Sequence, residues 1–270
     1  MITREDFWAK SNGQSVEQHT KELLNLFDDF CNKYGDKFDD KTKLLIILAS
    51  KYHDLGKINS SFQYYIHKQI NVNVDKFKKG LCHYSNIKSK DIPHGILSGA
   101  FISKKKLLAQ GLDLEDYKVV VSSVINQHIR SLKNEDGDDT IIEIVNTDLA
   151  LMAEKYGLNY CNAIPIIKHN FFKRQTEFNF EEQLWLKYAT VKGMLNKLDY
   201  AASAGEQQIE ISPENAYALS KQAMLNKGFS LRPCQQYMED KGEKNIIMTA
   251  STGMGKTEAA MIWARTDKTF

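Results

Sequence analysis

Apolar residues recur every three to four positions along most of the chain up to residue 208, which is the spacing of one face of an α-helix. The clearest case begins after Ser15, a residue type that caps helices, and ends before Gly35. Its apolar face comprises Val16, His19, Leu23, Leu26, Phe27 and Phe30. Because only four prolines stand in 270 residues to break helices, we predict an all-α helical bundle for residues 1–208.

The same spacing predicts five further helices in this region. Their approximate ranges are 40–55, 93–111, 114–132, 140–156 and 180–204. The segment 58–93 shows no clear periodicity and is predicted to be irregular, with His67 and His83 on the surface. The helix over 40–55 carries a strong apolar run that leads into His53 and Asp54, and we expect Gly56 to end it.

Five predicted helices carry metal-capable side chains among the apolar residues that face the core. The set is His19, His53 with Asp54, His94, His128 and Asp199. A single histidine of this kind is usually bonded to a carbonyl in the core, and a single carboxylate is usually part of a buried ion pair or cap. Taken together, these residues would need several unrelated partners, whereas one shared metal site satisfies all of them. The sequence therefore predicts a metal centre between facing helices.

Four imidazoles and two carboxylates are too many ligands for one tetrahedral ion, and they suit two divalent metals bridged by a carboxylate. Imidazole-rich mixed sites favour Mn²⁺, Fe²⁺, Co²⁺, Ni²⁺ or Zn²⁺ over Mg²⁺. Such a pair of ions activates water for attack on phosphorus, so the predicted chemistry is phosphoester hydrolysis. Asp54 and Lys57 are the candidate catalytic residues. Lys57, one helical turn after His53, is expected to neutralise a phosphate oxygen, and the alternative is a solvated lysine at the end of the helix.

A basic stretch lies between His67 and Pro93, with six lysines and two aspartates, a local charge of +4. Phe77 and Tyr84 lie among these charges. Lysines with interleaved aromatic rings suit single-stranded nucleic acid, because the rings stack on bases while the lysines follow the phosphates. A solvated surface insertion explains the same composition equally well. The candidate DNA-binding residues are Lys76, Lys78 and Lys79.

Composition narrows the class of protein. The net charge is +2, so any affinity for nucleic acid has to come from a local patch rather than from a global field. Four cysteines are scattered singly, which is typical of a reducing compartment. The N-terminus lacks the apolar core of a signal peptide, and no run approaches the length of a membrane span. We expect a cytoplasmic protein with no membrane partner.

The last part of the chain shows a different pattern. A helix is expected from Ser212 to Gly228, inside a connecting segment over 209–230. A predicted strand over 245–249 then leads into Ala-Ser-Thr-Gly-Met-Gly-Lys-Thr-Glu at 250–258, followed by a helix. This context predicts a phosphate-binding loop, in which the lysine reaches the outer phosphates and the threonine holds Mg²⁺. Its candidate nucleotide-binding residues are Gly253, Gly255, Lys256 and Thr257.

The order of the candidate ligands, with the sequence His53-Asp54-Leu55-Gly56-Lys57, resembles the HD superfamily of metal-dependent phosphohydrolases. The resemblance covers about residues 10–205. It implies that Asp54 bridges two metals, with His19, His53 and Asp199 on the first ion. His94 and His128 are then implied as the ligands of the second ion.

The end of the chain resembles the start of a superfamily 2 helicase with a RecA-like α/β fold, placed here at 231–270. Arg232-Pro233-Cys234-Gln235 resembles the adenine-reading motif of those helicases, so Gln235 is implied as the adenine contact. An HD domain followed by such a motor resembles the CRISPR-associated nuclease–helicase family of type I interference. That resemblance implies cleavage of single-stranded DNA, as an endo- or exonuclease. It also implies a 3′-to-5′ helicase that uses ATP and Mg²⁺, and recruitment by an RNA-guided surveillance complex.

Two features depart from that family. Its members often carry paired histidines at the fourth motif, but Gln127 and Ile129 flank His128 here, so we expect the second metal to be held more weakly or through water. No acidic strand motif, arginine finger or second motor domain follows before Phe270, so ATPase or helicase activity is not expected from these residues. Two other functions remain open: an HD hydrolase of nucleotides or cyclic nucleotides, and a non-catalytic, metal-stabilised module that binds DNA.

Overall fold

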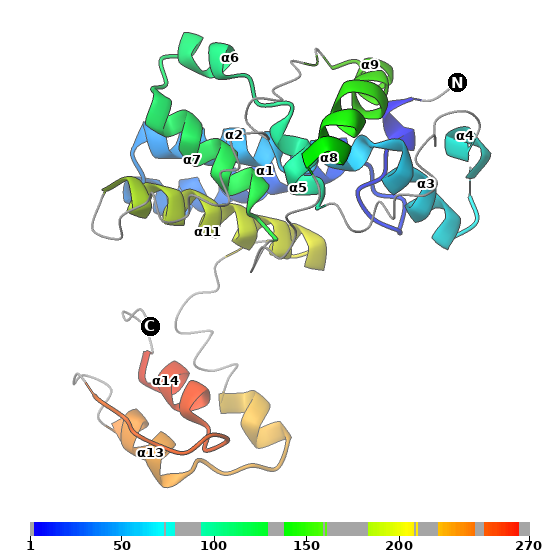
Figure 1. The fold of residues 1–270 in the computed structure, drawn as a ribbon. Coiled ribbons are helices and arrows are strands. Elements are labelled where there is room, and N and C mark those ends of the chain that lie inside the picture. Colours follow the sequence, from blue (N-terminus) through cyan, green and yellow to red (C-terminus); the bar gives the residue numbers. More distant parts are fainter. Residues whose placement is uncertain are drawn as a thin grey trace. The chain divides into compact units, whose positions relative to one another are not determined.

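Figure 1 shows the protein as a ribbon, drawn from a computed structural model. The chain divides into two compact units, Met1–Ile209 and Glu210–Phe270, and each is described by itself. The residues that the structure describes are 3–72, 74–78, 93–128, 138–158, 160, 183–207, 209, 221–240 and 246–264.

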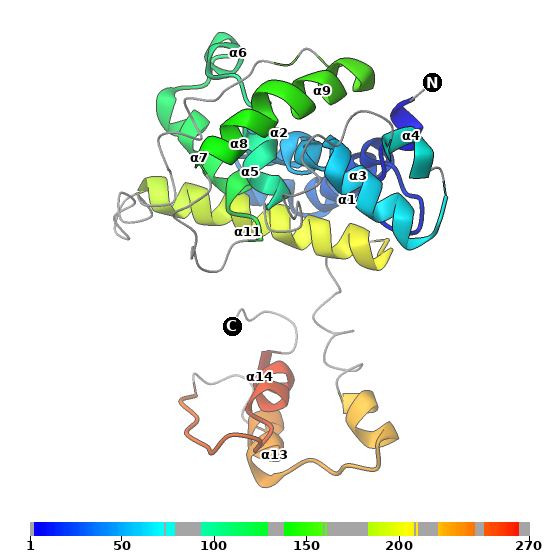
Figure 2. The same cartoon turned by 45° about the vertical axis from the view of Figure 1, so that its right-hand side comes forward.

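Four long helices form the centre of the first unit. They are α1 (Val16–Tyr34), α2 (Asp40–Tyr52), α7 (Leu114–Ile125) and α11 (Gln183–Ala204). α11 packs against the other three, and both ribbon views show it along one side of them (Figure 1, Figure 2). The apolar faces of the four helices meet in one core, so polar residues on those faces are brought close together.

Shorter helices complete the first unit. They are α3 (Ser60–Gln69), α4 (Val74–Lys78), α5 (His94–Gly99), α6 (Lys104–Ala109), α8 (Asp138–Ile144) and α9 (Ala150–Tyr156). α5 packs against α7 and against the 3-10 helix Leu55–Ile58 that follows α2. The π-helical segment Val145–Leu149 joins α8 to α9 without a break.

The start of α1 follows the sequence rules. Oγ of Ser15 accepts a hydrogen bond from the N–H of Gln18 at 3.1 Å, and the Gln18 side chain accepts one from the N–H of Ser15 at 3.0 Å. This capping box confirms the predicted cap, and the predicted apolar face, His19 included, is buried. The described residues form helices, turns and one isolated bridge between Trp8 and Ser15, so the all-α fold class is confirmed. None of the described helices is long and apolar enough to cross a membrane.

The prediction that the second helix reaches residue 55 and ends at Gly56 is wrong. α2 ends before His53, and Leu55–Ile58 form a 3-10 helix instead. A glycine is needed at position 56 because α5 crosses there: a Cβ would overlap the carbonyl oxygen of His94. The N–H of Gly56 donates to Oγ of Ser98 at 2.8 Å, and this hydrogen bond fixes the crossing.

The helix predicted over 93–111 is divided into α5 and α6, which is a second correction. Ser103 starts α6, because its side-chain oxygen accepts a hydrogen bond from the N–H of Lys106 at 3.3 Å. The break changes the helical register. Leu107 is therefore fully buried, whereas Leu108, which the continuous pattern places in the core, is exposed.

The helix predicted over 114–132 ends earlier than expected. α7 stops at Ile125, and the N–H of Asn126 closes its last turn on the carbonyl oxygen of Ser122 at 3.0 Å. The prediction that His128 lies on an apolar helix face is therefore wrong. His128 lies in the turn after the helix, and its side chain is 40% exposed.

Part of the segment predicted to be irregular is helical, because α3 and α4 lie in it. The prediction that His67 is on the surface is wrong, since this residue is fully buried. Its ring stacks on Trp8 with centroids 3.9 Å apart and lies 4.8 Å from the ring of Phe77. The periodicity missed α3 because polar residues, among them Ser60 and Gln63, occupy much of its buried face.

The second unit contains α13 (Pro233–Asp240) and α14 (Lys256–Ala264), which pack on a small core of Met238, Ala259 and Ile262. Residues 221–226 are also helical, and Gly228 follows with a φ of 73°. The strand predicted over 245–249 is not formed in its described part, 246–249. A strand needs a neighbouring strand to take its backbone hydrogen bonds, and the described residues provide none. The RecA-like α/β start therefore stays a prediction.

Candidate metal centre

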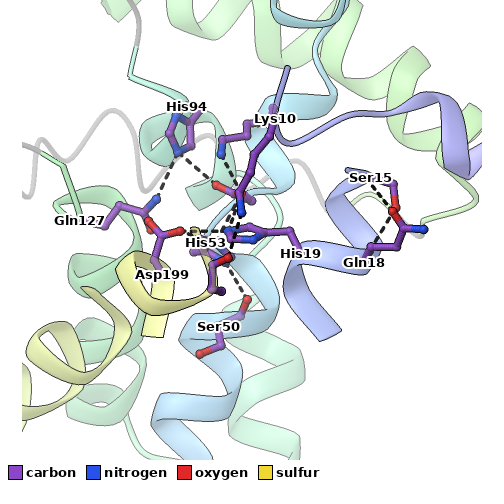
Figure 3. A network of polar contacts seen from close by, with 12 residues as sticks. Lys10, Ser15, Gln18, His19, Ser50, His53, His94, Gln127 and Asp199 are labelled. Carbon is purple, nitrogen blue, oxygen red and sulfur yellow. Dashed lines mark hydrogen bonds and ion pairs between the residues drawn. The ribbon is translucent and has the colours of Figure 1, made fainter. Parts of the chain in front are cut away.

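His53 and Asp54 lie where α2 ends and the 3-10 helix begins, inside the first unit. Nδ1 of His53 donates to the carbonyl oxygen of Ser50 at 2.7 Å, so this nitrogen carries the proton (Figure 3). Nε2 keeps its lone pair, and it is buried with no hydrogen-bond partner among the described residues. A metal-ligating histidine requires this tautomer and this orientation.

Two carboxylate oxygens and a second imidazole face Nε2 of His53. Oδ2 of Asp54 lies 3.4 Å from it, and Oδ1 of Asp199 lies 3.9 Å from it. Nε2 of His19 lies 2.9 Å from the same oxygen of Asp199 and 3.7 Å from that of Asp54. These four residues, the first ligand set, come from α1, the end of α2 and α11. Ligand atoms of His19, His53 and Asp54 all lie within 4.8 Å of one another.

The two other candidate histidines, His94 and His128, form a second ligand set beside the first. Nε2 of His94 lies 3.2 Å from Oδ1 of Asp54, and Nε2 of His128 lies 3.6 Å from Oδ2 of Asp199. The centroids of the two rings are 5.1 Å apart. Each carboxylate therefore turns one oxygen to the first ligand set and the other oxygen to a histidine of the second. The structure thus brings all the residues predicted as ligands into one cluster.

Burial and mutual charge set the protonation of this cluster. Burial lowers the pKa of His53 and of His94, against the opposing effect of the nearby Asp54 carboxylate. Burial by itself raises the pKa of Asp54, but His53, Lys57 and His94 outweigh it and hold that pKa well below its usual value. At neutral pH these two rings therefore keep their lone pairs and the carboxylate is charged. This is the protonation state that binds a divalent cation.

Lys57 lies beside Asp54, as its position in the sequence predicts. Its Nζ is 2.8 Å from Oδ2 of Asp54 and 6.0 Å from the centroid of the Phe62 ring. The side chain is mostly buried at the edge of the cluster. Its ammonium group compensates part of the carboxylate charge and is within reach of a phosphate held by the same residues.

The two ligand sets fit divalent metal ions. Nε2 of His53 and Oδ1 of Asp54 are buried, and neither has a hydrogen-bond partner among the described residues. Leaving such an atom unpaired costs about 1–3 kcal/mol, and a bound cation removes that cost. Imidazole nitrogens combined with carboxylate oxygens are donors typical of first-row divalent metals.

Two residues at the cluster are not among the sequence candidates. Lys10 points toward it from the N-terminal loop, and its Nζ donates to the carbonyl oxygen of Ala202 at 3.2 Å (Figure 3). Nε2 of Gln127 lies 3.1 Å from Nε2 of His94 and 2.9 Å from Nε2 of His128. The sequence shows Gln127 only as a departure from paired histidines, and it contains no signal that marks Lys10.

Of the candidate DNA-binding lysines, the structure describes the side chain of Lys76, which lies on α4. Nζ of Lys76 is 2.6 Å from Oδ1 of Asp6, so this lysine anchors α4 to the N-terminal segment. Phe77 is fully buried, which contradicts its predicted role in stacking on bases. Lys78 is the last residue of α4, and its side chain is outside the described part of the structure. Lys79 and His83 also lie outside the described residues.

The loop before α14 is the one that the sequence predicts to bind phosphate. Gly253 and Gly255 have φ angles of 79° and 77°, a region that favours glycine. Nζ of Lys256 donates to the carbonyl oxygens of Ala250 and Ser251 at 2.7 and 2.8 Å. The ammonium group therefore lies inside the curve of the loop, where phosphate oxygens bind in such loops.

Gln235 lies next to this loop and is almost fully buried. Its Oε1 accepts a hydrogen bond from the N–H of Arg232 at 2.9 Å, and its Nε2 donates to the carbonyl oxygen of Gly255 at 3.3 Å. A cavity of about 640 Å³ adjoins these residues, and Phe229 and Thr257 are also part of its wall. Its volume is in the range of small-molecule sites.

The chain is similar in sequence to a known protein. It is 25% identical, over an alignment 311 positions long, to the "CRISPR-associated nuclease/helicase Cas3" of Methanothermobacter thermautotrophicus. The match covers 95% of this chain, which spans only 36% of the length of that relative. No family model and no solved structure matches the chain. The similarity supports a relationship between this chain and that nuclease/helicase.

Proposed function

We propose that the first unit is a metal-dependent nuclease of the HD type and that it cleaves single-stranded DNA in CRISPR interference. The observation that carries the proposal is the placement of Asp54 and Asp199, each with one oxygen toward each ligand set. Carboxylates placed in this way hold two cations side by side, as in enzymes that cleave phosphodiesters by in-line attack. The similarity to a nuclease/helicase supports DNA as the substrate.

Bound divalent ions would supply a hydroxide near neutral pH and neutralise charge on the phosphate. Mn²⁺, Fe²⁺, Co²⁺, Ni²⁺ or Zn²⁺ is expected rather than Mg²⁺, because imidazoles outnumber carboxylates among the candidate ligands. The side chains of the protein have separate roles. Ser50 orients His53, Asp54 stays ionised between the two ligand sets, and Lys57 donates to a phosphate oxygen.

The similarity to the nuclease/helicase also supports a proposal about how the DNA strand reaches the metal centre. The single strand would be provided in the cytoplasm by an RNA-guided surveillance complex and drawn in by a helicase. The chain spans 36% of the length of the related nuclease/helicase. Helicase activity of the whole protein is therefore also a proposal.

The experiment is a cleavage assay on circular single-stranded DNA with Mn²⁺, because cutting a circle requires an endonuclease and is not mimicked by contaminating exonucleases. We expect cleavage that stops with a chelator and falls by about a hundredfold or more in His53→Ala and in Asp54→Ala. Lys51→Ala is the matched control, because Lys51 is exposed on the last turn of α2, and it should cleave normally.

Absence of cleavage of both the circle and a linear single strand, or cleavage that persists in both variants, would contradict the nuclease. The other two functions give different results in the same assay. Release of phosphate or nucleoside from small nucleotides, with the DNA intact, would show a nucleotide hydrolase. Tight binding of DNA with no metal-dependent turnover would show a binding module.

We also propose that the second unit binds a nucleotide. The observation is the cavity beside the phosphate-binding loop, bounded by Gln235 and Lys256. Fluorescent ATP with Mg²⁺ should bind weakly, and Lys256→Ala should weaken that binding by about tenfold. Lys227→Ala removes another lysine that lines the same cavity, outside the loop, and should have a smaller effect. Equal binding by wild type and Lys256→Ala would contradict this site.

A further inference from the structure

The turn after α7 carries two consecutive polar side chains that differ in their exposure. Asn126 closes the last turn of the helix, and the chain then turns Gln127 inward and leaves His128 partly exposed. Gln127 is only 6% exposed, although it is polar and lies on an irregular turn. A buried amide needs partners for both of its ends, so its contacts show what the site can hold.

One end of the Gln127 amide is fully engaged. Nε2 lies 3.1 Å from Nε2 of His94 (Figure 3) and 2.9 Å from Nε2 of His128, so the amide contacts both rings of the second ligand set. Neutral imidazoles offer lone pairs at these nitrogens, and the amide N–H groups donate to them. The amide therefore lies at the place toward which both rings direct their donor atoms.

The other end of the amide has no partner. Oε1 of Gln127 is buried and makes no hydrogen bond to any described residue. Rotation of the amide by half a turn exchanges its nitrogen and its oxygen. Because Oε1 has no hydrogen bond to lose, this rotation gives up the two contacts to the rings, which a cation would take over, and moves the amide N–H groups to the place that Oε1 now occupies.

Asp54 supplies the remaining donor at this place. Its Oδ1 lies 3.2 Å from Nε2 of His94 and is also buried without a hydrogen-bond partner among the described residues. Two imidazoles, one carboxylate oxygen and one amide end thus converge. We infer that Gln127 is a ligand of the second metal ion and that it binds through Oε1, beside His94, His128 and Asp54. This inference rests on the proposed metal centre.

An amide ligand changes which ion the site prefers. The amide oxygen is neutral and hard, whereas an imidazole is a borderline donor that favours Co²⁺, Ni²⁺ and Zn²⁺. The second site is therefore weaker than the first and more tolerant of Mn²⁺. Gln127→His adds a third imidazole and should shift the preference of this site from Mn²⁺ to Co²⁺ by about tenfold or more.

The test is a count of bound ions, without DNA and without activity. Metal-free protein is titrated with Mn²⁺ by calorimetry, and the ions per chain are counted after equilibrium dialysis. Wild type should take up two ions, the second more weakly. Gln127→Ala should bind the first ion normally and the second about tenfold or more weakly. Gln110→Ala, the same substitution at an exposed glutamine at the end of α6, should match wild type.

Three results would overturn the inference: unchanged second-ion affinity in Gln127→Ala, uptake of a single ion by wild type at saturating Mn²⁺, or no change of preference in Gln127→His. Melting curves of the metal-free variants separate a lost ligand from a damaged fold. A failure of the proposed nuclease function gives a different result. A protein that binds two ions through Gln127 but leaves DNA intact contradicts the proposed function and leaves this inference standing.

Discussion

Nε2 of His19 lies 2.9 Å from Oδ1 of Asp199, although the two residues are 180 positions apart in the sequence. His19 is fully buried on α1, and Asp199 lies on α11. Burial by itself raises the pKa of Asp199, but the hydrogen bond from His19 and the charges of His53 and Lys57 together lower that pKa. The contact joins the beginning and the end of the first unit, so a metal ion bound there also holds its helices together.

This contact predicts that metal binding stabilises the fold. Adding Mn²⁺ or Co²⁺ to metal-free protein should raise the melting temperature by about 5 °C or more, because the ion binds only the folded chain. Asp199→Ala should remove most of that rise. Tyr200→Ala, at an exposed neighbour on the same helix, should keep it. Equal stabilisation of the two variants would show that Asp199 is not a ligand.

Lys10 is expected to act on substrate rather than on metal. Burial lowers its pKa, while the carboxylates of Glu22 and Asp199 act in the opposite direction. Its Nζ donates a hydrogen bond to the carbonyl oxygen of Ala202, and it makes no ion pair with the described residues. Its ammonium group can therefore turn to a phosphate. Lys10→Met should raise the KM for single-stranded DNA by about tenfold.

The control for the Lys10→Met variant is Lys51→Met, which removes an exposed lysine from α2 and should leave the KM unchanged. Ion counts for Lys10→Met should equal those of wild type. A lower ion count, with KM unaffected, would assign Lys10 to the metal centre instead of the substrate.

Two glycines should respond to alanine in opposite directions. Gly56→Ala places a methyl group on the backbone of α5, at the carbonyl oxygen of His94, and should cost about 3 kcal/mol or more of folding free energy. Gly193 lies exposed within α11 with no atom of the described residues within 4 Å of an added Cβ. Gly193→Ala should therefore stabilise the protein by about 0.5–1 kcal/mol.

Urea denaturation of the metal-free proteins measures both effects. The comparison separates the general preference of helices for alanine from the specific crossing at Gly56. A Gly56→Ala variant as stable as wild type would show that α5 does not approach the chain as closely as described.

The pair formed by Asp6 and Lys76 predicts a pH dependence of stability. Burial raises the pKa of Asp6, but hydrogen bonds from Lys76 and Thr3 outweigh it, so the pKa lies below its usual value of 3.8. The folded protein therefore binds fewer protons on this group than the unfolded chain. The resulting stability is present above pH 3.8 and is lost as the pH falls through the lower folded pKa.

Asp6→Asn should accordingly cost about 1 kcal/mol at pH 7, a modest value because Lys76 is partly exposed. The difference from wild type should disappear at acidic pH. Lys76→Met and the double variant complete a thermodynamic cycle, and the coupling energy should show the same loss with falling pH. A difference that does not change with pH would contradict the ionic contribution.

The sequence by itself determined the helices with a regular apolar face and the residue types at the candidate centre. The period of α1, its Ser15 cap and the burial of His19 follow from interactions between residues three or four positions apart. The fold class follows from the same local rule. The sequence also contains the His53-Asp54 pair and the glycines of the phosphate-binding loop, because these features are contiguous.

Only the tertiary structure decided how the side chains meet. The break between α5 and α6 and the early end of α7 depend on packing, so a periodic pattern extended both helices too far. His67 is buried because Trp8 and Phe77 enclose its ring, which no local pattern shows. Which oxygen of Asp54 faces which histidine, and the positions of Lys10 and Gln127, depend on contacts between distant segments. Periodicity reports which face of a helix is buried, whereas the packing of helices decides what that face touches.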